Sequence, residues 1–450
     1  MHEWALKGVK VNNRAKTFLL FLLGLFSLTK VHIVGLMSIS EIFVFPMAPL
    51  IFFMDYSKLR KDAFLNVLLL IFIMMISMFV SAWWNQSAKA YVVREFAILY
   101  GWFAFIVVFH NLLRNNYRGL GWFFLGVAFS SIITIFVLNP SIQVSEAGAV
   151  MRDQTSVEQV MDSQIFWFER LFAVGRIPIV LMYYSTPISY CILAPIGLTI
   201  FSLLTTISGR SGSLIVLVAA GMMFVGQKSR RRMAIIGRHF FTFAIVAIVI
   251  VGIYKFTYSH LAKNGVLGAE AQGKYLAQTI NGDDALHLLM AGRKEFFIGI
   301  KAALDKPIIG HGPRPQDKKG YLIDYMLKYG SERDIAWLRE LQRQGMVGTI
   351  PTHSHIIAAW VYYGVSGLIF FIYVLWLIYV LLRKYISAIP QWFGWFALLA
   401  PSLVWQILFS PYSARSGLAM SITTLLFAKA VGQRRLVLPY DMEIEARAHD

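Results

Sequence analysis

The chain has 450 residues, of which 57% are hydrophobic and only 15% are charged, and its mean hydropathy is +0.60. A soluble domain carries about a quarter charged residues, so this composition excludes an ordinary soluble protein. The formal net charge is +18. The Lys and Arg residues cluster in short connections between apolar runs, which is typical of membrane proteins and argues against nucleic-acid binding.

The apolar runs are continuous rather than alternating, so helices are expected and strands are not. Many approach the length of about 20 residues that crosses a bilayer. The sequence therefore predicts an all-α polytopic membrane protein with about 12 transmembrane helices. The apolar runs are 17–37, 38–54, 62–83, 92–112, 120–139, 177–209, 212–227, 240–256, 356–382, 391–409 and 416–432.

The charges of the connections predict on which side each one lies. Residues 1–16, 55–61 and 113–119 are basic and are expected in the cytoplasm, whereas 84–91 is nearly uncharged and is expected outside. The C-terminal tail also begins with basic residues, so both termini are expected inside. That arrangement requires an even number of crossings.

The number of crossings becomes even if the run 177–209 forms two short membrane helices or a re-entrant pair, so that the chain returns to the outer face. Pro187 and Pro195 can break a helix there, giving two short helices or a re-entrant pair. This interpretation places the Ser-Gly-Arg-Ser-Gly segment around Arg210 on the outer face. The long loop 257–355 is expected on that same face.

Four regions follow from this pattern. Residues 1–256 are expected to hold the N-terminal transmembrane helices, and 257–355 a large periplasmic loop that contains helices of its own. Residues 356–432 are expected to form the C-terminal transmembrane helices, and 433–450 a cytoplasmic tail.

Two histidines, His353 and His355, lie at the water-facing start of the run 356–382. The positive end of a helix disfavours imidazolium, and a neutral imidazole is what a general base requires. The alternative is that interfacial histidines simply suit the headgroup region. Their spacing does not place both on one helical face, so a zinc pair is not expected. His311, in a Gly-His-Gly turn, is expected to be structural or exposed.

Five arginines are candidates for binding an anionic substrate. Arg210 lies between two apolar runs among small residues and could hold a phosphate through two parallel hydrogen bonds, the alternative being a snorkelling side chain. Arg293 starts an amphipathic loop helix, where a cation and a helix N-terminus together favour an anion, the alternative being a solvated charge. Arg415, Arg170 and Arg176 are further candidates by their position near the outer face.

The single cysteine, Cys191, excludes an intrachain disulfide and a cysteine-based metal cage. The sequence holds no Walker loop, no dinucleotide fingerprint and no metal-ligand spacing, so neither a metal nor a cofactor is expected. The energy for any reaction would then come from an activated substrate.

Three segments carry a resemblance to a known family. His353-Ser354 is followed after nine residues by Gly364, and Gly292-Arg293 is followed by Lys-Pro-Ile-Ile-Gly-His-Gly at 306–312. The third segment is the Ser-Gly-Arg-Ser-Gly stretch at 208–212. Through these segments the chain resembles the bacterial O-antigen ligase and O-antigen polymerase superfamily, over roughly 200–385.

The resemblance implies an inverting, metal-independent glycosyltransferase of the bacterial inner membrane whose site faces the periplasm. The donor would be a glycan on undecaprenyl diphosphate. The resemblance assigns Arg210 and Arg293 to the diphosphate and His353 to the acceptor hydroxyl. His355, Arg415, Arg170 and Arg176 would be further substrate-binding residues. The acceptor would be lipid A core in a ligase and another lipid-linked glycan in a polymerase.

Two other classes stay open from the residues alone. The broken run 177–209 would suit a transporter or flippase for a lipid-linked sugar, because transporters bind at discontinuous helices. Such folds usually contain paired repeats, and the sequence shows none. A structural scaffold would leave the histidines and arginines of the outer face unexplained.

Overall fold

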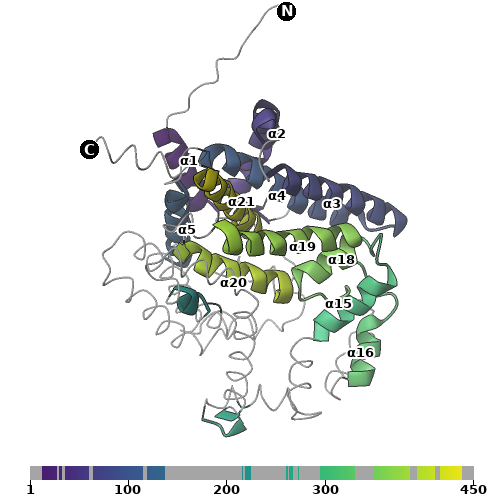
Figure 1. Cartoon of the computed structure of the whole chain (residues 1–450). Coiled ribbons are helices and arrows are strands. Elements are labelled where there is room, and N and C mark those ends of the chain that lie inside the picture. Colours follow the sequence, from purple (N-terminus) through teal and green to yellow (C-terminus); the bar gives the residue numbers. More distant parts are fainter. Residues whose placement is uncertain are drawn as a thin grey trace, which may run out of the picture.

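The structure is a computed structural model of the chain and describes the following residues: 13–27, 30–32, 36–59, 64–114, 119–136, 215, 218–223, 260–261, 263–266, 272, 294–329, 348–385, 393–410 and 416–437. These residues are almost entirely helical (Figure 1). The helices are α1 (Asn13–Leu25), α2 (Ile39–Leu59), α3 (Phe64–Trp84), α4 (Lys89–Leu113), α5 (Gly119–Phe136), α15 (Lys294–Asp305), α16 (Tyr321–Tyr329), α18 (His355–Tyr363), α19 (Val365–Val380), α20 (Phe393–Phe409) and α21 (Ser416–Val437), and a π-helical segment, η1 (Leu381–Tyr385), continues α19.

Three of these helical stretches are long and apolar enough to cross a membrane. They are α3, α4 and the stretch Val365–Tyr385 that joins α19 and η1. Shorter apolar stretches lie within α2, α20 and α21. Length and composition therefore support a multi-pass membrane protein, and the prediction of about 12 crossings stays a prediction.

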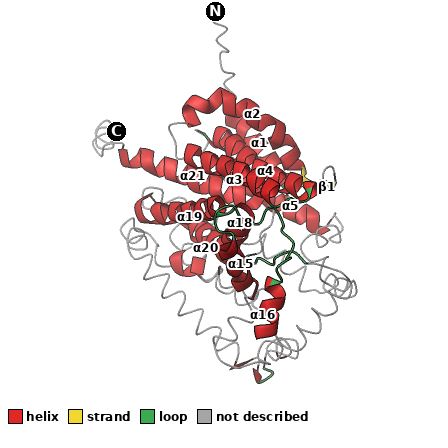
Figure 2. Cartoon of the chain, turned by 90° about the vertical axis from the view of Figure 1, so that its right-hand side faces the viewer, coloured by secondary structure: helices red, strands yellow, loops and turns green. Residues whose placement is uncertain are grey.

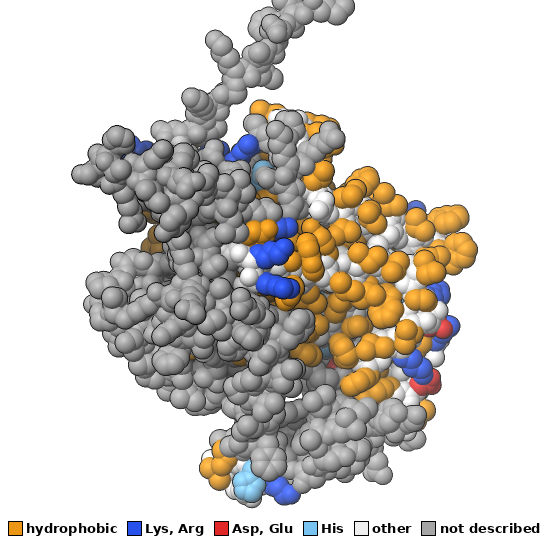
Figure 3. Space-filling view, viewed as in Figure 1, with side chains coloured by type: hydrophobic (Ala, Val, Ile, Leu, Met, Phe, Trp, Pro, Cys, Tyr) orange, Lys and Arg blue, Asp and Glu red, His pale blue; other side chains and the backbone are white. Residues whose placement is uncertain are grey.

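Side chains on the outside of α3 and α19 form a broad apolar face (Figure 3). Leucine, isoleucine, phenylalanine and tryptophan are exposed there, where a soluble protein would carry charge. A lipid environment covers such a face at no cost. The largest exposed members include Phe72, Ile76, Phe79, Trp83, Trp84, Ile369, Ile372 and Trp376.

Helix α4 forms the centre of the described part and packs against α2, α3 and α21. Its Trp102 is buried and stacks on Phe370, with the ring centroids 5.7 Å apart. Phe371 meets the same indole edge to face at 6.1 Å. These aromatic contacts fix α19 against α4.

Helices α1 and α5 approach each other closely at two glycines. A Cβ on Gly24 would lie 2.1 Å from the Phe123 carbonyl oxygen, and one on Gly126 would lie 2.2 Å from that of Phe21. Small residues at such crossings let two backbones touch within a membrane.

The first two expected apolar runs, 17–37 and 38–54, are not two adjoining helices. Helix α1 ends at Leu25, and a short antiparallel ribbon of β1 (Lys30–His32) and β2 (Leu36–Ser38) follows. The expectation of no strands is therefore wrong at this one place. Ser38 and Glu41 form a capping box that begins α2. The Ser38 amide donates to the Glu41 carboxylate at 2.6 Å, and the Glu41 amide donates to the Ser38 hydroxyl at 3.2 Å.

Contacts at the two ends of the helix bundle join segments that the charge pattern predicts to lie on the same face. At one end, Lys16 Nζ donates to the Asn111 carbonyl at 3.1 Å, which joins the N-terminal region to the end of α4. At the other end, Asn85 of the 84–91 connection contacts Lys306 of the long loop. Connections expected on one face thus lie together.

Candidate functional site

The segment that carries both candidate histidines lies at the start of α18 (Figure 2). Ser354 is the N-cap, and its hydroxyl accepts from the Ile357 amide at 3.4 Å. The same hydroxyl donates to the Ile407 carbonyl of α20 at 3.0 Å. Ser354 therefore both begins α18 and joins it to α20.

His353 precedes this cap, and its ring is partly buried. Its Nδ1 atom is buried and has no hydrogen-bond partner in the part of the chain that the structure describes. Buried polar atoms in proteins almost always have a partner, so an orphaned ring nitrogen needs an explanation. A group supplied from outside the protein, such as a substrate hydroxyl, would provide the missing partner.

His355, the first residue of α18, is buried and contacts protein backbone. Its Nδ1 lies 2.7 Å from the Gln406 carbonyl and 3.2 Å from that of Ser410, so this nitrogen carries the proton and donates. The last carbonyls of a helix lack a full set of intrahelical partners, and His355 supplies a side-chain donor at the end of α20, where the Ser410 amide also donates to the Gln406 carbonyl at 3.3 Å. A substrate-binding role for His355 stays a prediction.

The expected single run 356–382 is broken at Gly364, between α18 and α19. Gly364 has φ +68° and ψ −151°, a conformation that L side chains rarely adopt. A Cβ there would lie 1.9 Å from the Ile308 carbonyl oxygen. Only glycine fits this position, which gives the Gly of the His-Ser-x9-Gly pattern a structural reason.

The backbone of the Pro-Ile-Ile-Gly-His-Gly turn fills this break. The amides of His311 and Gly312 donate to the Val361 and Tyr362 carbonyls at 2.6 and 3.2 Å. The Val365 amide donates in turn to the Ile308 carbonyl at 3.2 Å. Two motifs that lie about 50 residues apart in the sequence therefore form one unit.

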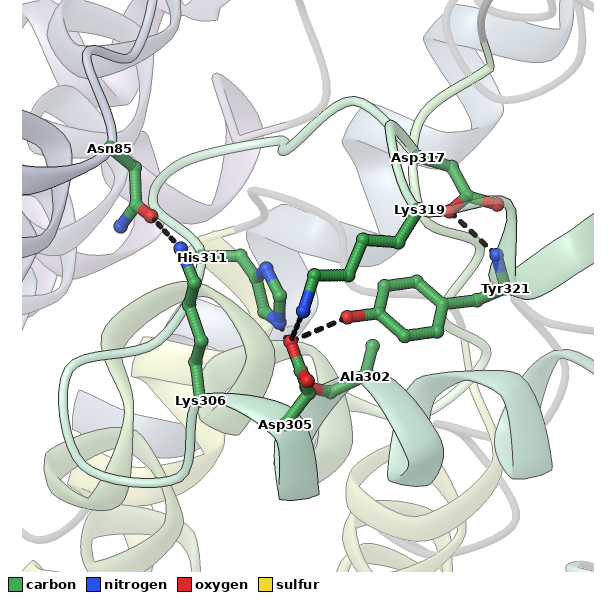
Figure 4. A network of polar contacts seen from close by, with 8 residues as sticks. All are labelled: Asn85, Ala302, Asp305, Lys306, His311, Asp317, Lys319 and Tyr321. Carbon is green, nitrogen blue, oxygen red and sulfur yellow. Dashed lines mark hydrogen bonds and ion pairs between the residues drawn. The ribbon is translucent and has the colours of Figure 1, made fainter.

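Asn85, at the end of α3, holds this turn to the membrane helices. Its side-chain oxygen accepts from Lys306 Nζ at 2.5 Å, the contact that Figure 4 draws. Its amide nitrogen donates to the Gly310 carbonyl at 3.1 Å and to that of Ser81 at 2.8 Å. The 84–91 connection thus forms part of the site.

A polar network supports the turn from the loop side (Figure 4). Asp305 accepts from Lys319 at 2.7 Å and from the Tyr321 hydroxyl at 2.8 Å, and these hydrogen bonds hold the pKa of Asp305 below its usual value. The Nε2 of His311 donates to the Ala302 carbonyl at 2.8 Å. Burial lowers the pKa of His311, so the ring is neutral and structural, one of the two roles expected for it.

A buried carboxylate lies beside the helix break, and the sequence analysis did not assign it a role. Glu95 of α4 has a fully buried side chain and accepts from Arg314 Nε at 3.2 Å and from the Tyr363 hydroxyl at 2.8 Å. A carboxylate inside an apolar helix is a strong signal of a specific partner, and this signal was available in the sequence. The identity of the partner was not, because Arg314 lies 219 residues away.

The segment that leads to His353, residues 349–352, is held in place by backbone pairing and by contact with α15. The Ile350 amide donates to the Pro315 carbonyl at 2.9 Å, next to a β-bridge between Gln316 and Thr349. Gly299 of α15 faces Thr352 so closely that a Cβ there would lie 3.4 Å from its methyl group. The segment that presents His353 is therefore held from two sides.

The structure brings together the segment 353–364 and the 306–312 part of the second motif segment, whose Gly292 and Arg293 lie outside the described residues. The candidate arginines Arg210, Arg293, Arg415, Arg170 and Arg176 lie outside the described residues. Two of them adjoin described neighbours in the chain: α15 begins directly after Arg293, and Ser410, which His355 contacts, lies five residues before Arg415.

Among the described residues, no group of three or more His, Cys, Asp or Glu side chains could hold a metal ion. The chemistry that this part of the chain offers is a buried ring nitrogen of His353 without a hydrogen-bond partner among the described residues, set in a rigid backbone frame. No family of proteins, no curated protein and no solved structure matches the chain in comparison.

Proposed function

We propose that the protein is a glycosyltransferase of the O-antigen ligase and polymerase type. It would transfer a glycan from undecaprenyl diphosphate to an acceptor hydroxyl at the periplasmic face of the bacterial inner membrane. The proposal rests on the resemblance of three sequence segments. The geometry of the two segments that the structure describes supports it.

The observation that carries the proposal is the state of His353. In the pattern His353-Ser354-x9-Gly364, the structure gives Ser354 a capping role and Gly364 a backbone role. Of these three residues only His353 has a buried side-chain nitrogen without a hydrogen-bond partner in the part of the chain that the structure describes. The motif residue whose ring nitrogen has no partner in the protein is the one that we expect a substrate to contact. Here the substrate group would be the acceptor hydroxyl, whose proton must leave during transfer.

The rigid frame around His353 suits a general base. A catalytic group must hold its geometry to within a fraction of an ångström, and supporting hydrogen bonds provide that. Ser354 is fixed to α20, and the turn 307–312 is fixed to α18. Arg210 and Arg293 would stabilise the diphosphate leaving group, as the resemblance implies.

The transporter alternative loses support at the helix break that the structure does describe. Transporters bind substrates at the free ends of discontinuous helices. At Gly364 these ends are filled by protein backbone, through the amides of His311 and Gly312 and the carbonyl of Ile308. No helix end is left open for a ligand there.

A reconstituted transfer assay tests the proposal. Purified protein would receive an undecaprenyl-diphosphate oligosaccharide alone, and then together with a lipid A core acceptor. We expect transfer by the wild type and a loss of about 10²–10⁴-fold in rate for His353→Ala, the usual contribution of general acid–base catalysis. The control is His260→Ala, which changes an exposed histidine of the same loop region.

The products distinguish the two subtypes. A ladder formed from the donor alone indicates a polymerase, and a single transfer that needs the core lipid indicates a ligase. Wild-type rates for a correctly folded His353→Ala protein would refute the mechanism. Donors left intact by the wild type across a range of cognate glycans would refute the enzyme proposal itself.

A further inference from the structure

Three cations gather at the end of α19 that lies away from His353. Arg383 and Lys384 are exposed residues of η1, and Lys429 belongs to α21, which packs against η1. Figure 3 shows basic side chains at this margin of the apolar face. The cluster is distinct from the candidate site, so its role does not depend on the proposed glycosyl transfer.

Lys429 is the unusual member, because it is a lysine within an apolar stretch of α21 and is only 8% exposed. Its Nζ lies 5.2 Å from the centroid of the Trp376 ring, a cation–π distance. Trp376 is itself 46% exposed on the apolar face of α19. The buried Lys429 ammonium is therefore held against a side chain that belongs to the exposed apolar face.

The cluster lacks an anion within the described residues. No carboxylate in this part of the chain forms an ion pair with Arg383, Lys384 or Lys429, and the charges of Lys384 and Lys429 repel each other. Arg383 is oriented by Tyr379, whose hydroxyl accepts from it at 2.7 Å. Cations held together next to an apolar surface need a counter-ion to offset their repulsion and desolvation.

We propose that this cluster binds the headgroup phosphate of an anionic membrane phospholipid. Lys384 and Lys429 would contact the phosphate, and the acyl chains would lie along the exposed apolar side of α19 past Trp376. Basic pockets between transmembrane helices are suited to such headgroups. A lipid fits better than a free phosphate, because the buried Lys429 contacts Trp376, whose ring is exposed on the apolar face along which acyl chains would lie.

A titration with fluorescent phosphatidylglycerol tests this site on the full chain in detergent. We expect saturable binding to the wild type, weakened about fivefold for each cation removed, which corresponds to about 1 kcal/mol per charge. The variants are Lys384→Gln, an exposed position, and Lys429→Met, which keeps the apolar stem. The matched control is Lys301→Gln, an exposed lysine of α15 that should leave binding unchanged.

Three outcomes would overturn the proposal. Binding of fluorescent phosphatidylcholine as tight as that of phosphatidylglycerol would show that the charge is not recognised. A correctly folded Lys384→Gln protein could retain wild-type affinity for phosphatidylglycerol, which would remove the cluster from the binding site. Displacement of the lipid by millimolar inorganic phosphate alone would identify a free-anion site instead.

Discussion

Glu95 shows how one buried carboxylate can hold a loop to a membrane bundle. Its side chain is fully buried, whereas that of Arg314 is 28% exposed, so the arginine brings the charge that Glu95 needs. Removing one partner of a buried pair leaves an uncompensated charge. Removing both partners together avoids that penalty.

We therefore predict that Arg314→Met destabilises the protein by about 3 kcal/mol, near the lower end for a broken buried pair because Arg314 is partly exposed. The double variant Arg314→Met with Glu95→Gln should recover most of this loss. Thermal unfolding in detergent measures both. Additive effects of the two substitutions would show that the ion pair contributes no coupling energy.

His311 makes stability depend on pH in a direction that its environment determines. Burial lowers the pKa of His311 in the folded protein, so between the folded pKa and the ordinary histidine pKa the unfolded chain binds a proton that the folded chain does not. Stability should be constant above about pH 6.5 and fall as the pH drops from there toward the folded pKa.

The test compares the melting temperature at pH 7.5 and pH 5.5 for the wild type and for His311→Gln, values chosen to bracket the ordinary histidine pKa of about 6.5. The wild type should lose more stability on acidification than the variant, whose amide can still donate to Ala302. Asp305 does not interfere, because its lowered pKa keeps it charged over this range. Equal losses would mean that His311 does not contribute.

At the scale of elements, the break between α18 and α19 depends on one glycine. Gly364→Ala should destabilise the protein by at least about 1–3 kcal/mol from the backbone conformation alone, before the clash with Ile308 is added. The control is Gly348→Ala, where a Cβ meets nothing within 4 Å. Equal melting temperatures for the two variants would show that the backbone relaxes without cost.

The α1–α5 crossing gives an independent prediction on the same physical basis. Gly126→Ala should separate the two helices, because its Cβ would meet the Phe21 backbone. Gly121→Ala, on the same helix, meets nothing within 4 Å and should be neutral or slightly stabilising. Melting temperatures in one detergent compare the pair directly, and a Gly126→Ala protein as stable as Gly121→Ala would contradict the close crossing.

These elements also show where sequence patterns stop being informative. The apolar run 356–382 contains no charged residue, so its pattern predicts one helix, and the helix is broken. The break is made by Ile308 and its neighbours, which lie more than 50 residues away and act through backbone atoms. By contrast, the starts of α2 and α15 depend on residues that are close in the sequence. Ser38 and Glu41 form the capping box that opens α2, and α15 begins directly after Arg293.

At the scale of the whole molecule, the grouping of connections can be measured. In a Cys191→Ser background, Ala88→Cys and Lys318→Cys should react with a membrane-impermeant thiol reagent added from one side. Arg14→Cys should react only from the other side, because Lys16 lies at the opposite end of the bundle. Labelling of Ala88→Cys and Arg14→Cys from the same side would contradict the arrangement.

The candidate site divides in the same way between what the sequence predicts and what it does not. Spacing placed His353 just before a helix start, and the structure confirms that position. The partner of Glu95 and the contact of Asn85 with Lys306 could not be predicted, since each joins residues more than 200 positions apart. Long-range polar pairing leaves no periodic signal in a single sequence.

The distance between Glu95 and Arg314 has a consequence for how the chain is made. The ribosome adds about 5–20 residues per second, so the 219 residues between them take about 10–40 s to synthesise. During that interval the carboxylate of Glu95 lacks the ion pair that Arg314 provides. We expect the contacts of α4 to stay incomplete until the loop and the helices that follow it have been made, because Arg314, Tyr363 and α21 all come later in the chain.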